Sequence, residues 1–126
     1  MRTFKKYFKI TASPEDVYNA LTNPLMIEIW TGEKAVMEET PGSEFSLWDE
    51  SITGQNIEFE KNKKIVQEWY FGEQEERSIV TIKLHPDKQG TSMEVVHTNI
   101  PDDAYENIVE GWQDDYFDAL NQLFEE

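Results

Sequence analysis

Two stretches of sequence decide the fold: FSLWDESITGQNIEF at 45–59, continued by KKIVQEWYF at 63–71, and GWQDDYF at 111–117. The first is rich in β-branched and aromatic residues and is interrupted by polar turns, which is typical of strands. The second lies where apolar residues recur at three- and four-residue steps, which predicts a helix. Together they predict a curved sheet around one helix, an architecture that often encloses a small-molecule cavity.

Upstream of these stretches, the sequence predicts one strand and two short helices. Apolar residues alternate with lysine and tyrosine over Phe4–Ile10, which indicates a strand with one buried face. Ser13-Pro14 followed by two acidic residues is a helix start, because serine caps the first turn and proline fits its first position. Asn23-Pro24 repeats this signal for a helix through about Trp30, which Thr31-Gly32 ends.

Most of the remaining chain reads as a meander of strands followed by a long helix. The predicted strands are a short one at Ala35–Glu38, then Glu44–Trp48, Ser51–Phe59, Lys64–Phe71, Ser78–Leu84 and Thr91–Thr98. Gly54 suggests a bulge or bend, and Gly72–Glu76 a short acidic loop. The last helix runs from about Pro101 to Phe124. We therefore predict one α+β domain over 1–126, with about six to seven antiparallel strands curved around the long C-terminal helix.

Composition restricts the function classes. The chain has 26 acidic and 11 basic residues, a net charge of −15 that repels nucleic acid and anionic lipid. The simplest role of this charge is to keep a small domain soluble. With no cysteine, neither a disulfide framework nor thiolate metal ligation can form. No signal peptide or membrane span is recognisable, so we expect a cytoplasmic protein.

Strand alternation and helical periodicity bring a mostly apolar set of side chains to one interior. From the sheet and the helix, the residues expected to face each other are Gln67, Trp69, Val80, Ile82, Met93, Val95, His97, Ile108, Trp112 and Tyr116. A pocket for an apolar ligand, with a few orienting polar groups, has this make-up. A filled core has it too. Both interpretations fit these residues.

Neither catalysis nor metal binding has a clear signature. His97 could act as a general base or orient a ligand, but a hydrogen-bonded histidine at a strand end is the commoner situation. His85 precedes Pro86 at a hairpin end and is expected to be exposed. Carboxylates cluster on the last helix at Glu106, Glu110, Asp114, Asp115 and Asp118. Without a glycine-punctuated calcium loop, they read as a solvated acidic face, so we assign no metal, no cofactor and no catalytic residue.

The sequence resembles the Hsp90 ATPase activator homologue family over essentially the whole chain. The resemblance rests on Phe45–Asp49 with Ile52–Gly54, on Lys64–Phe71, on Gly111–Gln113 with Tyr116-Phe117, and on Ser13–Tyr18. This family belongs to the START-like and Bet v 1-like (SRPBCC) superfamily. The resemblance implies a helix-grip fold and an Hsp90-type chaperone as a candidate partner. In eukaryotic activators the main chaperone-stimulating work belongs to a separate N-terminal domain, which these 126 residues do not contain.

Three functions follow as hypotheses. The first is a binding module that holds a small apolar or aromatic ligand between the sheet and the helix. The second is a chaperone-associated interaction module of the stress response, whose acidic helix would meet a basic surface. The third is an enzyme of the cyclase or hydrolase kind, which would need a paired acid and base. An open cavity with His97 or Gln67 at its wall would favour the first, and a closed interior the second.

Overall fold

A six-stranded antiparallel sheet, in the order β1-β6-β5-β4-β3-β2, forms the centre of the computed structural model, which describes residues 1–71 and 76–125. Its strands are β1 (Arg2–Ile10), β2 (Glu44–Leu47), β3 (Ile52–Glu60), β4 (Lys64–Trp69), β5 (Ser78–Asp87) and β6 (Gly90–Ile100). The predicted acidic loop at 72–76 lies, apart from Glu76, outside the described residues.

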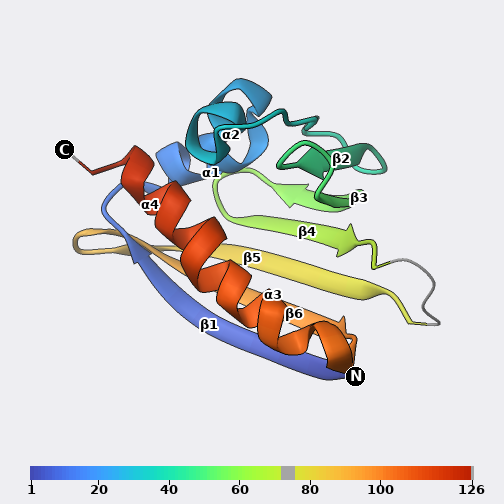
Figure 1. Ribbon diagram of the computed structural model, residues 1–126. Coiled ribbons are helices and arrows are strands. Elements are labelled where there is room, and N and C mark those ends of the chain that lie inside the picture. The colour runs from blue at the N-terminus through green and yellow to red at the C-terminus, as the bar shows by residue number, and fades with distance from the viewer. Residues whose placement is uncertain (72–75, 126) are drawn as a thin grey trace.

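One long helix crosses a face of the sheet, and two short helices lie beside its C-terminal end (Figure 1). The long helix is continuous through η1 (Asp102–Ala104), α3 (Tyr105–Glu110), the π-helical segment η2 (Gly111–Phe117) and α4 (Asp118–Leu123). The short helices are α1 (Pro14–Thr22) and α2 (Pro24–Thr31). The predicted α+β arrangement of a curved sheet around a C-terminal helix is thereby confirmed.

The short helices begin and end where their capping residues predict. The Ser13 side chain accepts a hydrogen bond from the Asp16 backbone N–H at 3.2 Å, and Asn23 does the same for Leu25 at 3.0 Å. Gly32 then adopts a left-handed backbone with φ of 76°, and its N–H binds the last turn of α2. These local bonds satisfy backbone groups that a helix end would otherwise leave open.

Burial alternates along the strands as the sequence predicts. On β4, Ile65, Gln67 and Trp69 are buried, whereas Val66 and Glu68 between them are partly exposed. The buried residues of β5 and β6 are Ser78, Val80, Ile82, Leu84, Thr91, Met93, Val95, His97 and Ile100. Because successive side chains point to opposite faces, β4, β5 and β6 each bury one largely apolar face.

The predicted short strand at Ala35–Glu38 is wrong. Val36 forms a single antiparallel bridge with Ser46, with two backbone hydrogen bonds of 2.9 Å. The chain then turns away, since Thr40 N–H bonds back to the Glu38 carbonyl at 2.8 Å. One bridge without a continuing ladder does not make a strand.

Of the bulge or bend that the sequence suggested at Gly54, the bulge is not found at that residue. The shift in strand register lies two residues further on, between Asn56 and Glu58. A Cβ atom on Gly54 would lie 1.9 Å from the Glu68 carbonyl oxygen and 2.7 Å from the ring of Phe45. The position therefore requires glycine because a neighbouring strand and an aromatic ring both approach its backbone closely.

We expect Gly54→Ala to lower the free energy of unfolding by about 3 kcal/mol, because the added methyl group must displace a backbone carbonyl. Urea denaturation measures this loss. Gly111→Ala is the matched control, since the nearest atom to its Cβ would be 3.9 Å away. That variant should gain about 0.5 kcal/mol from helix propensity. Equal effects of the two substitutions would contradict the close-approach explanation.

Candidate functional site

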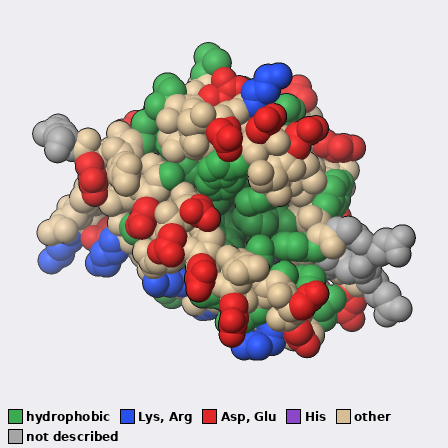
Figure 2. Space-filling view, in the orientation of Figure 1, with side chains coloured by type: hydrophobic (Ala, Val, Ile, Leu, Met, Phe, Trp, Pro, Cys, Tyr) green, Lys and Arg blue, Asp and Glu red, His purple; other side chains and the backbone are tan. Residues whose placement is uncertain are grey.

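A cavity of about 440 Å³ opens between the long helix and the β2–β3 side of the sheet. Figure 2 shows its mouth as a hollow of hydrophobic side chains in the middle of one face of the molecule. Eleven residues line it: Glu33, Trp48, Ser51, Ile52, Trp69, Asn107, Ile108, Gly111, Trp112, Asp115 and Tyr116. Beneath the long helix, side chains such as Leu120, Val80 and Val95 are fully buried in the core. The open cavity lies beside this core.

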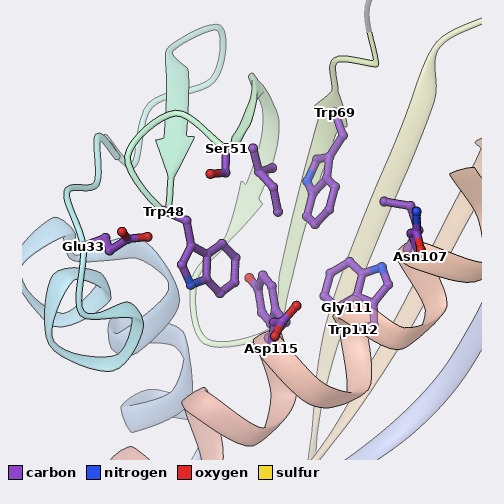
Figure 3. Close-up of a pocket in the computed structure, with 11 residues that line it drawn as sticks. Glu33, Trp48, Ser51, Trp69, Asn107, Gly111, Trp112 and Asp115 are labelled. Carbon is purple, nitrogen blue, oxygen red and sulfur yellow. The ribbon is translucent and has the colours of Figure 1, made fainter.

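Four aromatic rings form a continuous arc along the wall of the cavity. The ring centroid of Trp48 lies 5.9 Å from that of Tyr116, which lies 4.5 Å from that of Trp112. Trp112 is stacked on Trp69 at 5.0 Å. Figure 3 shows Trp48 on one side of the pocket, with Trp69 and Trp112 on the other. Such rings combine a large apolar surface with electron-rich faces, so they can bind apolar, aromatic or cationic groups.

Trp48 is held in the wall by an uncommon backbone. It and the next two residues, Asp49 and Glu50, have positive φ values of 50°, 50° and 71°. For a bulky residue this conformation is rare and needs support from its surroundings. The Asp49 N–H supplies part of that support by binding the Lys34 carbonyl at 2.9 Å.

The helix contributes to the cavity mainly through its π-helical segment. Gly111, Trp112, Asp115 and Tyr116 all belong to η2, and its defining bond runs from the Asp118 N–H to the Gln113 carbonyl, five residues back. A π segment inside an α-helix is rare and occurs frequently at functional sites. Here it places the large rings at 112 and 116 against the sheet, with the carboxylate at 115 beside them.

The hydroxyl of Tyr116 lacks a hydrogen-bond partner within 1–71 and 76–125. The side chain is 5% exposed, and burial raises the pKa of the phenol well above its usual range. A buried polar group that makes no bond is costly, and most buried hydroxyls are paired. Since Tyr116 lines the cavity, a molecule bound there could supply the missing acceptor or donor.

Below the cavity, a chain of buried polar groups fixes Trp69. Its indole N–H donates to Gln67 Oε1 at 3.1 Å, and Gln67 Nε2 donates to Asn56 Oδ1 at 3.0 Å. Asn56 Nδ2 donates in turn to Ser43 Oγ at 3.1 Å. Gln67 therefore uses its polar atoms inside the protein and orients the tryptophan above it.

The bonds of His97 determine its tautomer. The indole N–H of Trp112 lies 3.1 Å from His97 Nδ1, and because indole can only donate, Nδ1 must accept. The proton of the neutral ring is therefore on Nε2, which donates to Ser78 Oγ at 2.8 Å. Ser78 Oγ donates onward to the Thr98 carbonyl at 3.1 Å.

This arrangement is the reverse of a serine–histidine catalytic pair. A general base would need a free lone pair on the nitrogen that faces the serine, and that nitrogen carries the proton. Burial also lowers the pKa of His97 from its ordinary 6.5 to about 4, which keeps the ring neutral. His97 thus fits the hydrogen-bonded structural role that the sequence analysis weighed against catalysis.

The predicted site residues separate into two groups. Trp69, Ile108, Trp112 and Tyr116 line the cavity. The others are buried beside or beneath it and do not belong to its lining, namely Gln67, Val80, Ile82, Met93, Val95 and His97.

The lining residues that sequence reasoning missed are Glu33, Trp48, Ser51, Ile52, Asn107, Gly111 and Asp115. Trp48 and Ile52 lie within the stretch 45–59 that decided the fold, so a signal for them existed. Alternation along β4, β5 and β6 says nothing about them, because Trp48 lies in the turn before β3 and Ile52 is the first residue of β3. The turn before β3 contributes Trp48 and Ser51 to the lining, whereas β4, β5 and β6 contribute Trp69 alone.

The carboxylates of the long helix and the second histidine, His85, lie at the surface. Glu106, Glu110, Asp114, Asp115 and Asp118 are all exposed. In the part of the chain that the structure describes, no three histidine or carboxylate side chains gather into a metal site. His85 is exposed as predicted and lies 2.8 Å from Glu94 Oε1.

A family model and several known proteins relate this chain to activators of the Hsp90 ATPase. The family model "Activator of Hsp90 ATPase homolog 1-like protein" matches residues 11–125. An activator of 90 kDa heat shock protein ATPase homolog from Dictyostelium discoideum is 32% identical over an alignment of 126 positions, which covers 98% of this chain and 33% of that protein. The human homolog 1 is 31% identical over 97% of this chain and 36% of its own length. This chain thus spans about a third of the length of these relatives.

Solved structures agree with the fold. An HSP90 activator from Plasmodium falciparum superposes with a TM-score of 0.85 at 25% identity, covering 96% of this chain and 94% of that one. A protein from Mesorhizobium loti gives 0.83 at 28% identity, covering 97% and 96%. The Aha1 dimer from Colwellia psychrerythraea gives 0.86 at 19% identity, covering 99% and 97%, and shows the fold alone. Among the described residues, no helix is both long and apolar enough to cross a membrane.

We expect His97 to make the stability of the protein fall on mild acidification. Between pH 6.5 and about 4, the unfolded chain binds a proton on this ring that the native state does not bind. The free energy of unfolding should therefore drop by about 2 kcal/mol from about pH 7 to about pH 5 on account of this group. Urea denaturation at the two pH values measures the drop.

His97→Gln should be less stable at both pH values but should lose this part of the pH dependence, because glutamine does not titrate. His85→Gln is the control, since it removes the exposed histidine and leaves His97 in place. If His97→Gln keeps the full drop, His97 is not its source.

Proposed function

Because this chain belongs to the family of Activator of Hsp90 ATPase homolog 1-like proteins, we propose that it is a helix-grip binding module, and that a small, largely apolar or aromatic molecule binds between its sheet and its long helix. The fold of the family provides the cavity between the sheet and the helix. The ligand class follows from the walls of the cavity in this chain.

The observation that carries the proposal is the buried hydroxyl of Tyr116 in an aromatic cavity. A volume of about 440 Å³ falls within the range typical of small-molecule sites. Trp48, Trp69, Trp112, Ile52 and Ile108 provide apolar surface. Tyr116 adds one hydrogen-bonding group that has no other partner in the described residues. A ligand with an apolar body and one polar group would bury its body on these walls and bond to that hydroxyl.

The four tryptophans of the chain allow a direct test with 3-tert-butylphenol, which has an apolar body and one hydroxyl. In the ¹⁵N-labelled protein, each tryptophan gives one indole N–H signal. We expect the signals of Trp48, Trp69 and Trp112 to move on titration. Trp30 should move least, because it is outside the lining and its N–H is bonded to the Ala20 carbonyl at 2.9 Å.

Tyr116→Phe should weaken binding of this phenol by about fivefold, as expected for the loss of one neutral hydrogen bond. Tyr18→Phe is the matched control. It also removes a buried tyrosine hydroxyl, but that hydroxyl bonds Glu39 at 2.5 Å and lies outside the cavity lining. If neither this phenol nor phenols of the same shape that carry an ammonium or a sulfonate group move any of the three lining signals, the cavity is not a binding site.

A chaperone-associated role is the second candidate, and two observations favour it. The full-length relatives are named activators of the 90 kDa heat shock protein ATPase, and this chain covers about a third of them. The long helix also presents an exposed acidic face that could meet a basic surface.

We expect this role to produce a salt-sensitive complex with the Hsp90-type chaperone of the same organism. Isothermal titration at low and high ionic strength measures it. Reversing two helix charges in Asp114→Lys with Asp118→Lys should weaken the complex by at least about tenfold. Glu38→Lys with Glu44→Lys changes the net charge equally on a different surface and should weaken it less. Absence of any complex at low salt would contradict this role.

A further inference from the structure

The charged residues at the cavity have one sign. Of the eleven described residues that line it, only Glu33 and Asp115 are charged, and both are acidic. They come from separate elements, since Glu33 follows α2 and Asp115 belongs to η2. In Figure 2, acidic side chains lie around the hydrophobic hollow, while the lysine and arginine side chains in view lie further out.

These two carboxylates are free to act on a ligand. Neither forms an ion pair within residues 1–71 and 76–125, and both side chains are exposed. Glu33 is positioned by its backbone, whose N–H binds Thr31 Oγ1 at 3.3 Å. Asp115 is positioned by the helix. Their negative charges therefore act at the mouth of an apolar cavity, and the net charge of −15 adds to the field there.

The aromatic arc beside these carboxylates also attracts positive charge. The faces of indole and phenol rings carry negative partial charge, and a cation within about 6 Å of a ring centroid is stabilised by it. Trp48, Tyr116, Trp112 and Trp69 follow one another at centroid distances of 5.9, 4.5 and 5.0 Å. A cationic head in the cavity would therefore meet ring surfaces on its walls and carboxylates at its entrance.

We propose that the ligand of this cavity is an organic cation, namely a tertiary or quaternary ammonium carried on an apolar or aromatic skeleton. This inference rests on the proposed binding function and adds the charge of the ligand to it. A metal ion would not suit the site, because only two carboxylates line it, both are exposed, and no third histidine or carboxylate of the described residues joins them. An anionic ligand would meet repulsion from both carboxylates and find no lysine or arginine among the lining residues that the structure describes.

Three phenols of nearly the same shape test the charge preference. They are 3-hydroxyphenyltrimethylammonium, the neutral 3-tert-butylphenol and the anionic 3-hydroxybenzenesulfonate. Each is titrated into the ¹⁵N-labelled protein, and the indole signals of Trp48, Trp69 and Trp112 report binding, with Trp30 as reference. We expect the ammonium to bind about tenfold more tightly than the tert-butyl compound, as cation–π contacts and two nearby carboxylates together allow. The sulfonate should bind weakest.

Variants separate the two contributions to this preference. Glu33→Gln and Asp115→Asn should each weaken the ammonium about threefold while leaving the tert-butyl compound unchanged, because only the cation senses the lost charge. Asp114→Asn is the control for Asp115→Asn, as it removes a carboxylate one residue away that is outside the lining. Trp48→Leu should weaken the ammonium more than the tert-butyl compound, since leucine keeps apolar surface but has no ring.

The outcomes distinguish this inference from the function on which it rests. If the neutral phenol binds as tightly as the ammonium or more tightly, the cation preference is wrong and the cavity remains a binding site. If the sulfonate binds best, the preference is wrong in sign. If none of the three moves the lining signals, both the cation preference and the binding function fail.

Discussion

The contact between the long helix and the sheet through Trp112 is the constraint on which the rest of the structure depends. This one side chain stacks on Trp69 of β4, and its indole N–H donates a hydrogen bond to His97 of β6, so it joins the helix to two strands. It is 2% exposed, and a buried indole that is both packed and hydrogen-bonded fixes position and orientation together. The helix is therefore held at one angle and one rotation over the sheet.

Several features of the candidate site follow from this contact. With Trp112 fixed, the π-helical segment must direct Tyr116 and Asp115 to the same side, where the turn carrying Trp48 completes the wall. The same contact prevents His97 from serving as a base, because its Nδ1 is used to hold the helix. The buried polar groups of this protein thus position other side chains. The groups available to a ligand lie at the cavity: a hydroxyl without a partner among the described residues, aromatic faces and two carboxylates.

Most of the fold could be predicted because its signals are local. The period-two burial of Ile65, Gln67 and Trp69 and the helical steps through Trp112, Tyr116 and Leu120 depend on which face of an element is apolar. The Ser13 and Asn23 caps are likewise local. The predicted strand at Ala35–Glu38 is wrong because a strand requires a neighbouring strand that continues the hydrogen-bonded ladder, and Val36 forms only one bridge. The close approach at Gly54 could not be predicted, because it involves Phe45 and Glu68, whose positions beside the glycine depend on strand pairing.

The candidate site could be predicted only in part, for a related reason. By itself, the sequence determined the fold class, the family resemblance, the acidic character and four aromatic or aliphatic members of the cavity wall. Only the tertiary structure decided which interior side chains fill the core and which border open space. It also decided that Trp112 determines the tautomer of His97, and that Glu33 and Asp115 share a rim. Periodicity specifies the direction of a side chain from its own element, whereas a cavity depends on the distance between elements, which packing of the whole chain decides.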